Sequence, residues 1–187
     1  MANDNIPRGL VPLNWPSMPV HYYRVSTLND IYLGMAVQAD ATGYVVGVGT
    51  ATGVTLAIGV AVGFAGTLKR GLATSDPYLD VSDLTPPTPS SDTGDRYVLV
   101  ADSPNQEFLA QEDTEGTALS LAEAGAAVNM LFRGAGANVV TGNVDTGWAT
   151  SEIDASSVVT TTGAFLRLSR LHDYVNSDGT ENGVGDF

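Results

Sequence analysis

Residues 31–64 read IYLGMAVQADATGYVVGVGTATGVTLAIGVAVGF, and this stretch decides the fold. Short runs rich in Val, Ile and Tyr alternate in it with clusters of Asp, Thr and Gly. β-Branched and aromatic residues favour strands, whereas Gly, Asp and Thr clusters favour turns. We therefore predict three strands, over Ile31–Val37, Gly43–Val48 and Val54–Phe64.

The same pattern continues on both sides of this stretch. Further strands are predicted over Tyr22–Val25, Tyr97–Val100, Glu107–Gln111, Ala126–Phe132, Ser157–Thr162 and Ala164–Leu171. Turn signals recur at intervals of roughly ten residues, which is typical of a β-sandwich or barrel. One short helix is predicted over Thr117–Ala127, between Gly116 and Gly125. The expected fold is mainly β, a compact barrel- or sandwich-like domain with one short helix and an extended N-terminal arm.

Proline and glycine content divides the chain into three parts. Residues 1–20 contain four prolines, which prevent a helix and predict an extended arm. Residues 21–175 form a single β-rich domain, with a Pro- and Ser-rich surface loop at about 76–95. Residues 176–187 are rich in Gly, Asn and Asp and are expected to be a flexible tail.

The predicted arm is unusually apolar for an extended segment. Such a segment needs a surface to lie on, either its own domain or a neighbouring molecule. The residues that would make an intersubunit or partner interface are Ile6, Arg8, Leu10, Val11, Leu13, Trp15 and Met18. If the arm reaches a partner, deletion of Met1–Trp15 should abolish binding and leave the domain folded.

Composition limits the possible partners. The 187 residues carry a net charge of −13, and only 16% are charged, against about 25% in ordinary soluble chains. A field of this sign repels nucleic acid, so we expect no DNA or RNA partner. Cysteine is absent, which excludes disulfides and thiolate metal sites. Met1–Trp15 lacks the features of a signal peptide, and Val54–Ala65 is shorter than the ~20 apolar residues of a membrane span, so synthesis in the cytoplasm and no membrane contact are expected.

Two groups of residues superficially suggest a catalytic or cofactor site. Gly47–Gly53 is glycine-rich, but a predicted strand follows it where a dinucleotide site needs a helix. The histidines, His21 and His172, have no nearby His or Cys, so a polar surface or hydrogen-bonding role is favoured. We reject both sites.

Two acidic groups also lack a pattern that defines chemistry. The carboxylates at Glu107, Glu112, Asp113 and Glu115 are close in sequence, which does not place two of them across one cleft. Asn176–Gly183 has alternating oxygen donors without the order of a calcium loop. With no nucleophile motif either, we predict that the chain is not an enzyme and has no catalytic, cofactor or metal residues.

Four stretches, in order along the chain, are similar to those of a known family. They are Arg8–Leu13 (RGLVPL), Phe108–Gln111 (FLAQ), Ser151–Ser157 (SEIDASS) and Phe165–Leu171 (FLRLSRL). Together they resemble the capsid decoration, or cement, proteins of tailed bacteriophages. Family members usually close with a further Val/Ile-rich strand, whereas this chain ends in Gly183–Phe187 (GVGDF).

The resemblance implies a structural virion protein without catalysis or a cofactor. It would bind the outer surface of the capsid, bridge major capsid protein subunits and stabilise the shell. Self-association is also implied, as a trimer more readily than as a dimer.

A different class of function is a head-fibre or carbohydrate-binding β module. Aromatic residues on loops would serve it, with Tyr78 and Trp148 as candidates. Copy number separates the two, because cement proteins cover the shell and fibres are few. Trp15 and Trp148 could equally be core anchors.

Overall fold

The computed structural model describes the parts of the chain that carry its strands. The described residues are 9–13, 18–25, 30–41, 43–48, 57–65, 97–111, 119, 122, 124–128, 130–131, 142, 147–154, 158 and 166–169. Their regular structure is almost entirely antiparallel β-sheet, which confirms the predicted mainly-β class. Among these residues, no helix has the length and apolar character needed to cross a membrane.

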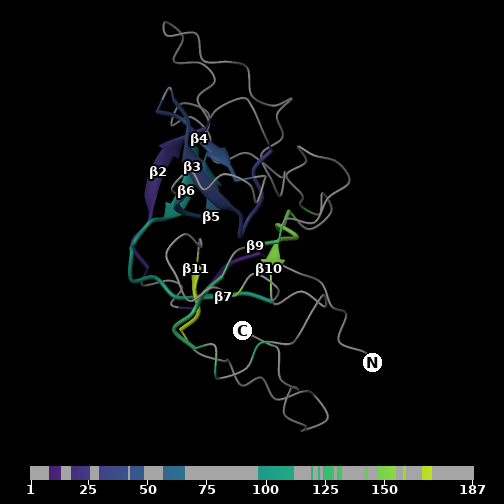
Figure 1. Ribbon diagram of the computed structural model, residues 1–187. Coiled ribbons are helices and arrows are strands. Elements are labelled where there is room, and N and C mark those ends of the chain that lie inside the picture. The colour runs from purple at the N-terminus through teal and green to yellow at the C-terminus, as the bar shows by residue number, and fades with distance from the viewer. Residues whose placement is uncertain are drawn as a thin grey trace, which may run out of the picture.

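The largest element is a five-stranded sheet, seen in the upper part of Figure 1. Its strands are β2 (His21–Arg24), β3 (Ala36–Ala39), β4 (Val45–Gly47), β5 (Ala57–Ala65) and β6 (Tyr97–Ala101). They lie in the order β2-β6-β5-β3-β4, and every neighbouring pair is antiparallel. The predicted Val- and Tyr-rich runs therefore meet in one sheet, and the longest run supplies β5 at its centre.

The sheet curls toward a barrel without closing into one. Val25, directly after β2, makes a single parallel bridge with Val45 of β4, so the two edges of the sheet meet at one point. One bridge does not seal a barrel, which needs a continuous ladder between the first and last strands. The described fold is sandwich-like, one of the two predicted forms.

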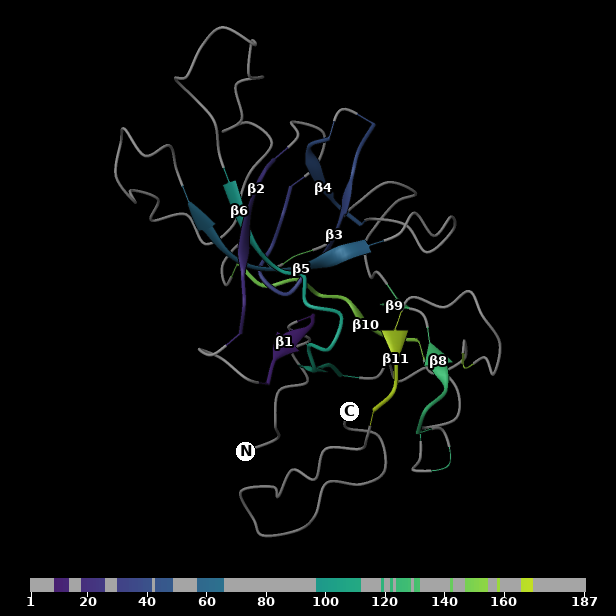
Figure 2. The same cartoon turned by 90° about the vertical axis from the view of Figure 1, so that its left-hand side faces the viewer.

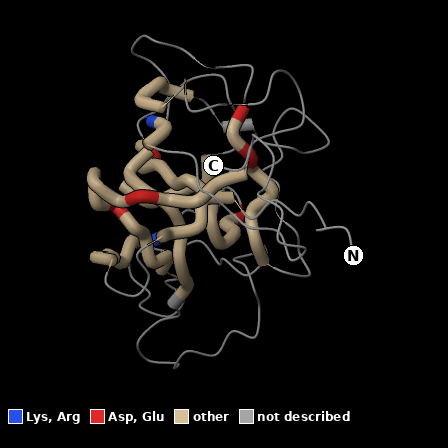
Figure 3. Tube along the Cα trace, turned by 90° about the horizontal axis from the view of Figure 1, so that it is seen from below, with Lys and Arg blue, Asp and Glu red and all other residues tan. Residues whose placement is uncertain are grey.

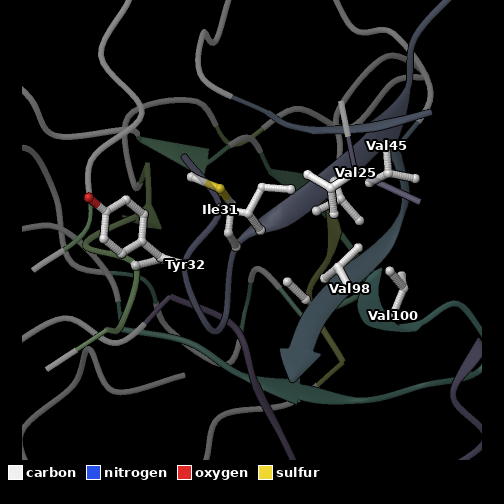
Figure 4. Packing of buried hydrophobic residues seen from close by; sticks show 10 residues of the cluster. Val25, Ile31, Tyr32, Val45, Val98 and Val100 are labelled. Atoms are coloured by element: carbon white, nitrogen blue, oxygen red, sulfur yellow. The ribbon is translucent and has the colours of Figure 1, made fainter. Parts of the chain in front are cut away.

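A first hydrophobic core fills the concave side of this curled sheet. It contains Val37, Val45, Val98 and Val100 from the strands and Ile31 and Tyr32 from the segment before β3. Figure 4 shows Val25, Val45, Val98 and Val100 close together with Ile31 beside them and Tyr32 to one side, and each labelled residue is less than 5% exposed. Dense packing of small branched side chains is what allows the sheet to curl tightly.

Three short strand pairs form the other half of the molecule. β1 (Val11–Pro12) pairs with β7 (Phe108–Leu109), and β9 (Met130–Leu131) pairs with β10 (Glu152–Ile153). β8 (Ala127–Val128) pairs with β11 (Leu166–Arg167). Figure 2 shows these short strands gathered beneath the five-stranded sheet. Each has only two residues, so the ladder bonds alone cannot hold them together.

A second hydrophobic core joins these pairs to the opposite face of the sheet. Its buried members are Leu10, Ala36, Val48, Val60, Ala110, Leu119, Val128, Ile153 and Leu168. Neighbouring residues of one strand enter different cores, because successive side chains point to opposite faces. Ala36 and Val60 lie in the second core, whereas Val37 and Ala61 lie in the first. The five-stranded sheet is therefore buried on both faces at this end.

Several predicted boundaries differ from the structure. The predicted strand from Ile31 begins later, at Ala36, and Ile31 and Leu33 make only single bridges. Glu152–Ile153 forms β10, although it was not predicted to be a strand.

In the predicted helix over 117–127, the described residues show no α-helix: Ala122 is in a 3-10 turn, and Ala127 begins β8. Gly125, whose φ of 89° leaves the helical region, prevents a helix from continuing into Ala126 and Ala127. Beside it, Ala126 accepts a hydrogen bond from the backbone N–H of Leu168.

Other predictions concern parts of the chain outside the described residues. The loop at 76–95, the tail at 176–187 and most of the predicted strand over 157–162 are among them.

Candidate binding groove

A groove of about 540 Å³ lies where the five-stranded sheet meets the short strand pairs. Runs of consecutive residues line it: Ala57–Val60, Ala101–Pro104, Gln106–Ala110 and Leu166–Ser169, joined by Leu10, Leu13 and Ile153. Successive side chains of a strand point to opposite faces of the sheet. Because consecutive residues all line the groove, the groove runs along the edges of these segments and not along one face. Its lining is mostly apolar and includes two carboxylates, Asp102 directly after β6 and Glu107 directly before β7.

All four stretches that carry the family resemblance converge on this groove. Leu10 and Leu13 come from the first stretch, Phe108–Ala110 from the second, Ile153 from the third and Leu166–Ser169 from the fourth. Backbone contacts join them in space. Val11 faces Leu109 across the β1–β7 ladder, and the N–H of Ile153 donates to the carbonyl oxygen of Gln111 at 2.7 Å. Segments far apart in the sequence thus build one structural unit.

The described part of the arm lies on its own domain, the first of the two alternatives. Leu10 is only 2% exposed, and its N–H donates to the carbonyl oxygen of Gly34 at 2.8 Å. The N–H of Leu13 donates to the carbonyl oxygen of Glu107 at 3.2 Å. Gly9, with φ of 67°, sits so close to Gly34 that a side chain would clash with the Gly34 carbonyl group.

The predicted interface residues accordingly fall into three groups. Leu10 and Met18 are buried, so they are not surface residues of this chain. Val11 and Leu13 are half-buried. Ile6, Arg8 and Trp15 lie outside the described residues.

Polar side chains mark the rim of the groove. Ser169 Oγ donates to Glu107 Oε1 at 3.0 Å, which links β11 to the start of β7. Gln106 Nε2 donates to the carbonyl oxygen of Glu107 at 2.8 Å. Arg167, two residues before Ser169, also lines the groove. The side chain of Glu107 is therefore held in place at the groove by Ser169. The other carboxylates of the predicted acidic group, Glu112, Asp113 and Glu115, lie outside the described residues.

A second polar cluster joins β2 to the end of β6 at the same rim. His21 Nδ1 lies 2.8 Å from Asp102 Oδ1 and 3.0 Å from Oδ2, and Tyr23 donates its hydroxyl to Oδ2 at 2.6 Å. Because a carboxylate only accepts hydrogen bonds, the Nδ1 proton of His21 faces Asp102. His21 is 65% exposed, whereas Asp102 is 17% exposed. This confirms the hydrogen-bonding role favoured for His21.

These contacts shift two pKa values in opposite directions. Partial burial is the largest single influence on Asp102 and would raise its pKa. The hydrogen bonds from Tyr23 and His21, with the charge of His21, together outweigh it and lower the pKa below 3.8. The hydrogen bond to Asp102, followed by burial and by the Asp102 charge, raises the pKa of Tyr23 above 10.0. Both shifts stabilise the arrangement of ionised Asp102 and neutral Tyr23.

Part of this cluster carried a sequence signal. His21 and Tyr23 are two apart on a strand, so they point to one face. Asp102 is far away in the sequence, and only the β2–β6 register, with His21 opposite Val100, brings it near. No local pattern could have paired it with His21.

The remaining predicted residues give no second site. Trp148 is half-buried and makes a parallel bridge with Leu33, so it belongs to the packed domain. Tyr78, His172 and Asn176–Gly183 lie outside the described residues. Across the described parts of the chain, no three His, Asp or Glu side chains come together in a group able to hold a metal ion.

No protein-family model matches the chain, and neither the curated proteins nor the solved structures contain a significant match to it.

Proposed function

We propose that the chain is a structural protein of a tailed-bacteriophage head, bound to the outer surface of the capsid. In this role it contacts the major capsid protein, bridges its subunits and stabilises the shell. The observation that carries the proposal is the convergence of all four resembling stretches on one groove and one core. If these stretches form a structural unit shared with the family, they are expected to meet in space as they do here.

The surface chemistry supports a binding role of this kind. Cementing a shell requires broad, preorganised contact rather than one reactive centre, and specific contacts typically bury about 1,200–2,000 Å² in total. The groove combines a mostly apolar lining with a rim in which Asp102 and Glu107 are held by hydrogen bonds. Held side chains lose little freedom on binding, which favours affinity.

Copy number in purified particles tests the proposal. Intact particles of the phage that encodes the chain are analysed by quantitative mass spectrometry against the major capsid protein. We expect a copy number comparable to that of the major capsid protein. A few copies per particle would instead support the head-fibre alternative, and absence from the particle would refute a virion role.

Particle stability tests the cementing part of the proposal separately. Heads that lack the protein should release their DNA at a lower temperature than complete heads, and adding back the purified protein should restore the difference. Equal release temperatures would show that the protein decorates the shell without stabilising it.

A further inference from the structure

One row of residues crosses three strands on the convex face of the sheet. Tyr22 of β2 lies opposite Leu99 of β6, and Leu99 lies opposite Gly63 of β5. Val98 and Val100 point into the first core, so Leu99 between them points to the other face. Directly opposite residues in a sheet share a face, so Tyr22 and the bare backbone of Gly63 flank Leu99 there.

The two ends of this row are complementary in shape. Tyr22 is 64% exposed, and among the described residues it is the one large hydrophobic side chain that is exposed to solvent. Gly63 has no side chain, and a Cβ added there would come no closer than 3.8 Å to a neighbouring atom, on Leu99. The row therefore presents an aromatic projection at one end and an unfilled position at the other.

We propose that this row is a self-association surface, on which a second copy docks about a two-fold axis at Leu99. With the axis parallel to β6, Tyr22 of each copy covers Gly63 of the other, and the two Leu99 side chains meet at the centre. Neighbouring strands are about 4.8 Å apart and packed sheets about 10 Å apart, so a tyrosine can span the gap between the faces. Such a two-fold contact is self-complementary because the same patch serves both copies.

The lack of acidic side chains among the described residues of this face reduces the repulsion that a second copy would meet. Each copy carries a net charge of −13, and acidic positions are prominent along the described trace in Figure 3. On β2, β6 and β5, however, the described residues that share the face of Leu99 include Arg24 and no Asp or Glu. Two acidic molecules can approach here with less repulsion than across an acidic surface. Tyrosine is also one of the residues that most often anchor protein interfaces.

Sedimentation velocity of the purified full chain over a range of concentrations tests the proposal. We expect a monomer–dimer equilibrium that shifts toward dimer as salt is added, because salt screens the repulsion between the two copies. A species that remains monomeric at the highest concentration would overturn the proposal. A trimer, the state that the family resemblance favours, would overturn it equally.

Two variants on different strands test whether this row makes the contact. Tyr22→Ser should raise the dimer dissociation constant about tenfold or more, whereas Tyr22→Phe, which keeps the ring, should change it by less than about threefold. The single molecule has room for a Cβ at Gly63, and the longer side chain of Gly63→Gln would occupy the position that Tyr22 of the second copy would cover, so this variant should abolish the dimer. Ala41→Gln, at an exposed position in the turn between β3 and β4, is the matched control and should leave the dimer intact.

Circular dichroism establishes that each variant is folded. If folded Tyr22→Ser and Gly63→Gln proteins dimerise like the original chain, the contact lies elsewhere and the proposal is wrong. The test does not involve the capsid, so its outcome is independent of the proposed function.

Discussion

The two halves of the molecule are built in different ways. The five-stranded sheet around the first core is formed by strands of up to nine residues, and its ladders are long enough to fix their own register. The half around the second core is formed by two-residue strands, which side chains from distant parts of the chain hold in place. The first half thus combines long backbone ladders with a core of its own, whereas the second depends mainly on side-chain packing. Substitutions that attack ladders or packing should therefore affect the halves differently.

The largest effect is expected from Gly59→Ala in β5, directly before the residue at which the β5–β6 ladder begins. A Cβ at Gly59 would collide with the backbone carbonyl group of Ala101, which cannot move without breaking the ladder. We expect a loss of about 4 kcal/mol or more in the free energy of unfolding, measured by urea denaturation.

The matched control for this change is Gly63→Ala on the same strand. The added Cβ there meets only ordinary contacts with Leu99, so the free energy of unfolding should change by less than about 1 kcal/mol. Equal losses for the two variants would show that the close approach at Gly59 is not what limits the sheet.

In the other half, Leu10→Ala is expected to have the next largest effect. Leu10 is 2% exposed in the second core, and truncation of a buried leucine typically costs about 2–5 kcal/mol. Leu13→Ala, at a half-buried position of the same segment, should cost about 1 kcal/mol or less. Comparable small losses for both would mean that the arm contributes little to the domain.

The burial of Leu10 also changes the result expected when Met1–Trp15 is deleted. Removal of Met1–Trp15 would take Leu10 out of the second core, so the deleted protein should be destabilised rather than left folded. A loss of shell binding in that deletion would therefore not by itself identify an interface.

A smaller effect is expected where β2 is tied to the end of β6. Asp102→Asn weakens the hydrogen bonds with His21 and Tyr23, and we expect a loss of about 1 kcal/mol at neutral pH in urea denaturation. His21→Ala should have less effect, because His21 is mostly exposed. A larger loss for His21→Ala than for Asp102→Asn would contradict the central role of the carboxylate.

The pH dependence of stability gives the finest test of the same cluster. The pKa of Asp102 is lowered in the folded state, so its contribution is present above 3.8 and is lost as the pH falls through the lower folded pKa. The pKa of Tyr23 is raised, so its contribution is present below 10.0 and is lost as the pH rises through the higher folded pKa. The stability difference between the original chain and Asp102→Asn should therefore shrink below about pH 4. A constant difference down to pH 2 would rule out this linkage.

The same contrast explains how much the sequence could predict. Strand formers and turn signals lie next to each other in 31–64, so the sheet follows from local patterns. β1 and β10 have two residues each, too few to show an alternating pattern, and β1 contains Pro12. The predicted helix does not extend over 125–127, because the turn at Gly125 and the pairing of Ala127 with β11 outweigh local helix preference there.

The groove could not be predicted from local sequence patterns either. Its lining comes from segments spread from Leu10 to Ser169, and the cluster at Asp102 depends on the register of β2 and β6. The family resemblance marked four of the stretches that line it, but only the packing of the second core shows that they meet.

The position of Leu10 has a consequence for the order in which the chain folds during synthesis. Residues 21–101, which supply all five strands of the sheet, leave the ribosome well before Ile153 and Leu168, the partners of Leu10 in the second core. The sheet has its full set of strands while that core is still incomplete. Because contacts distant in sequence form late, Leu10 is fully buried only after Ile153 and Leu168 have been made. Until then, Ala36, Val48, Val60 and Ala110 are among the second-core neighbours already made that can cover Leu10.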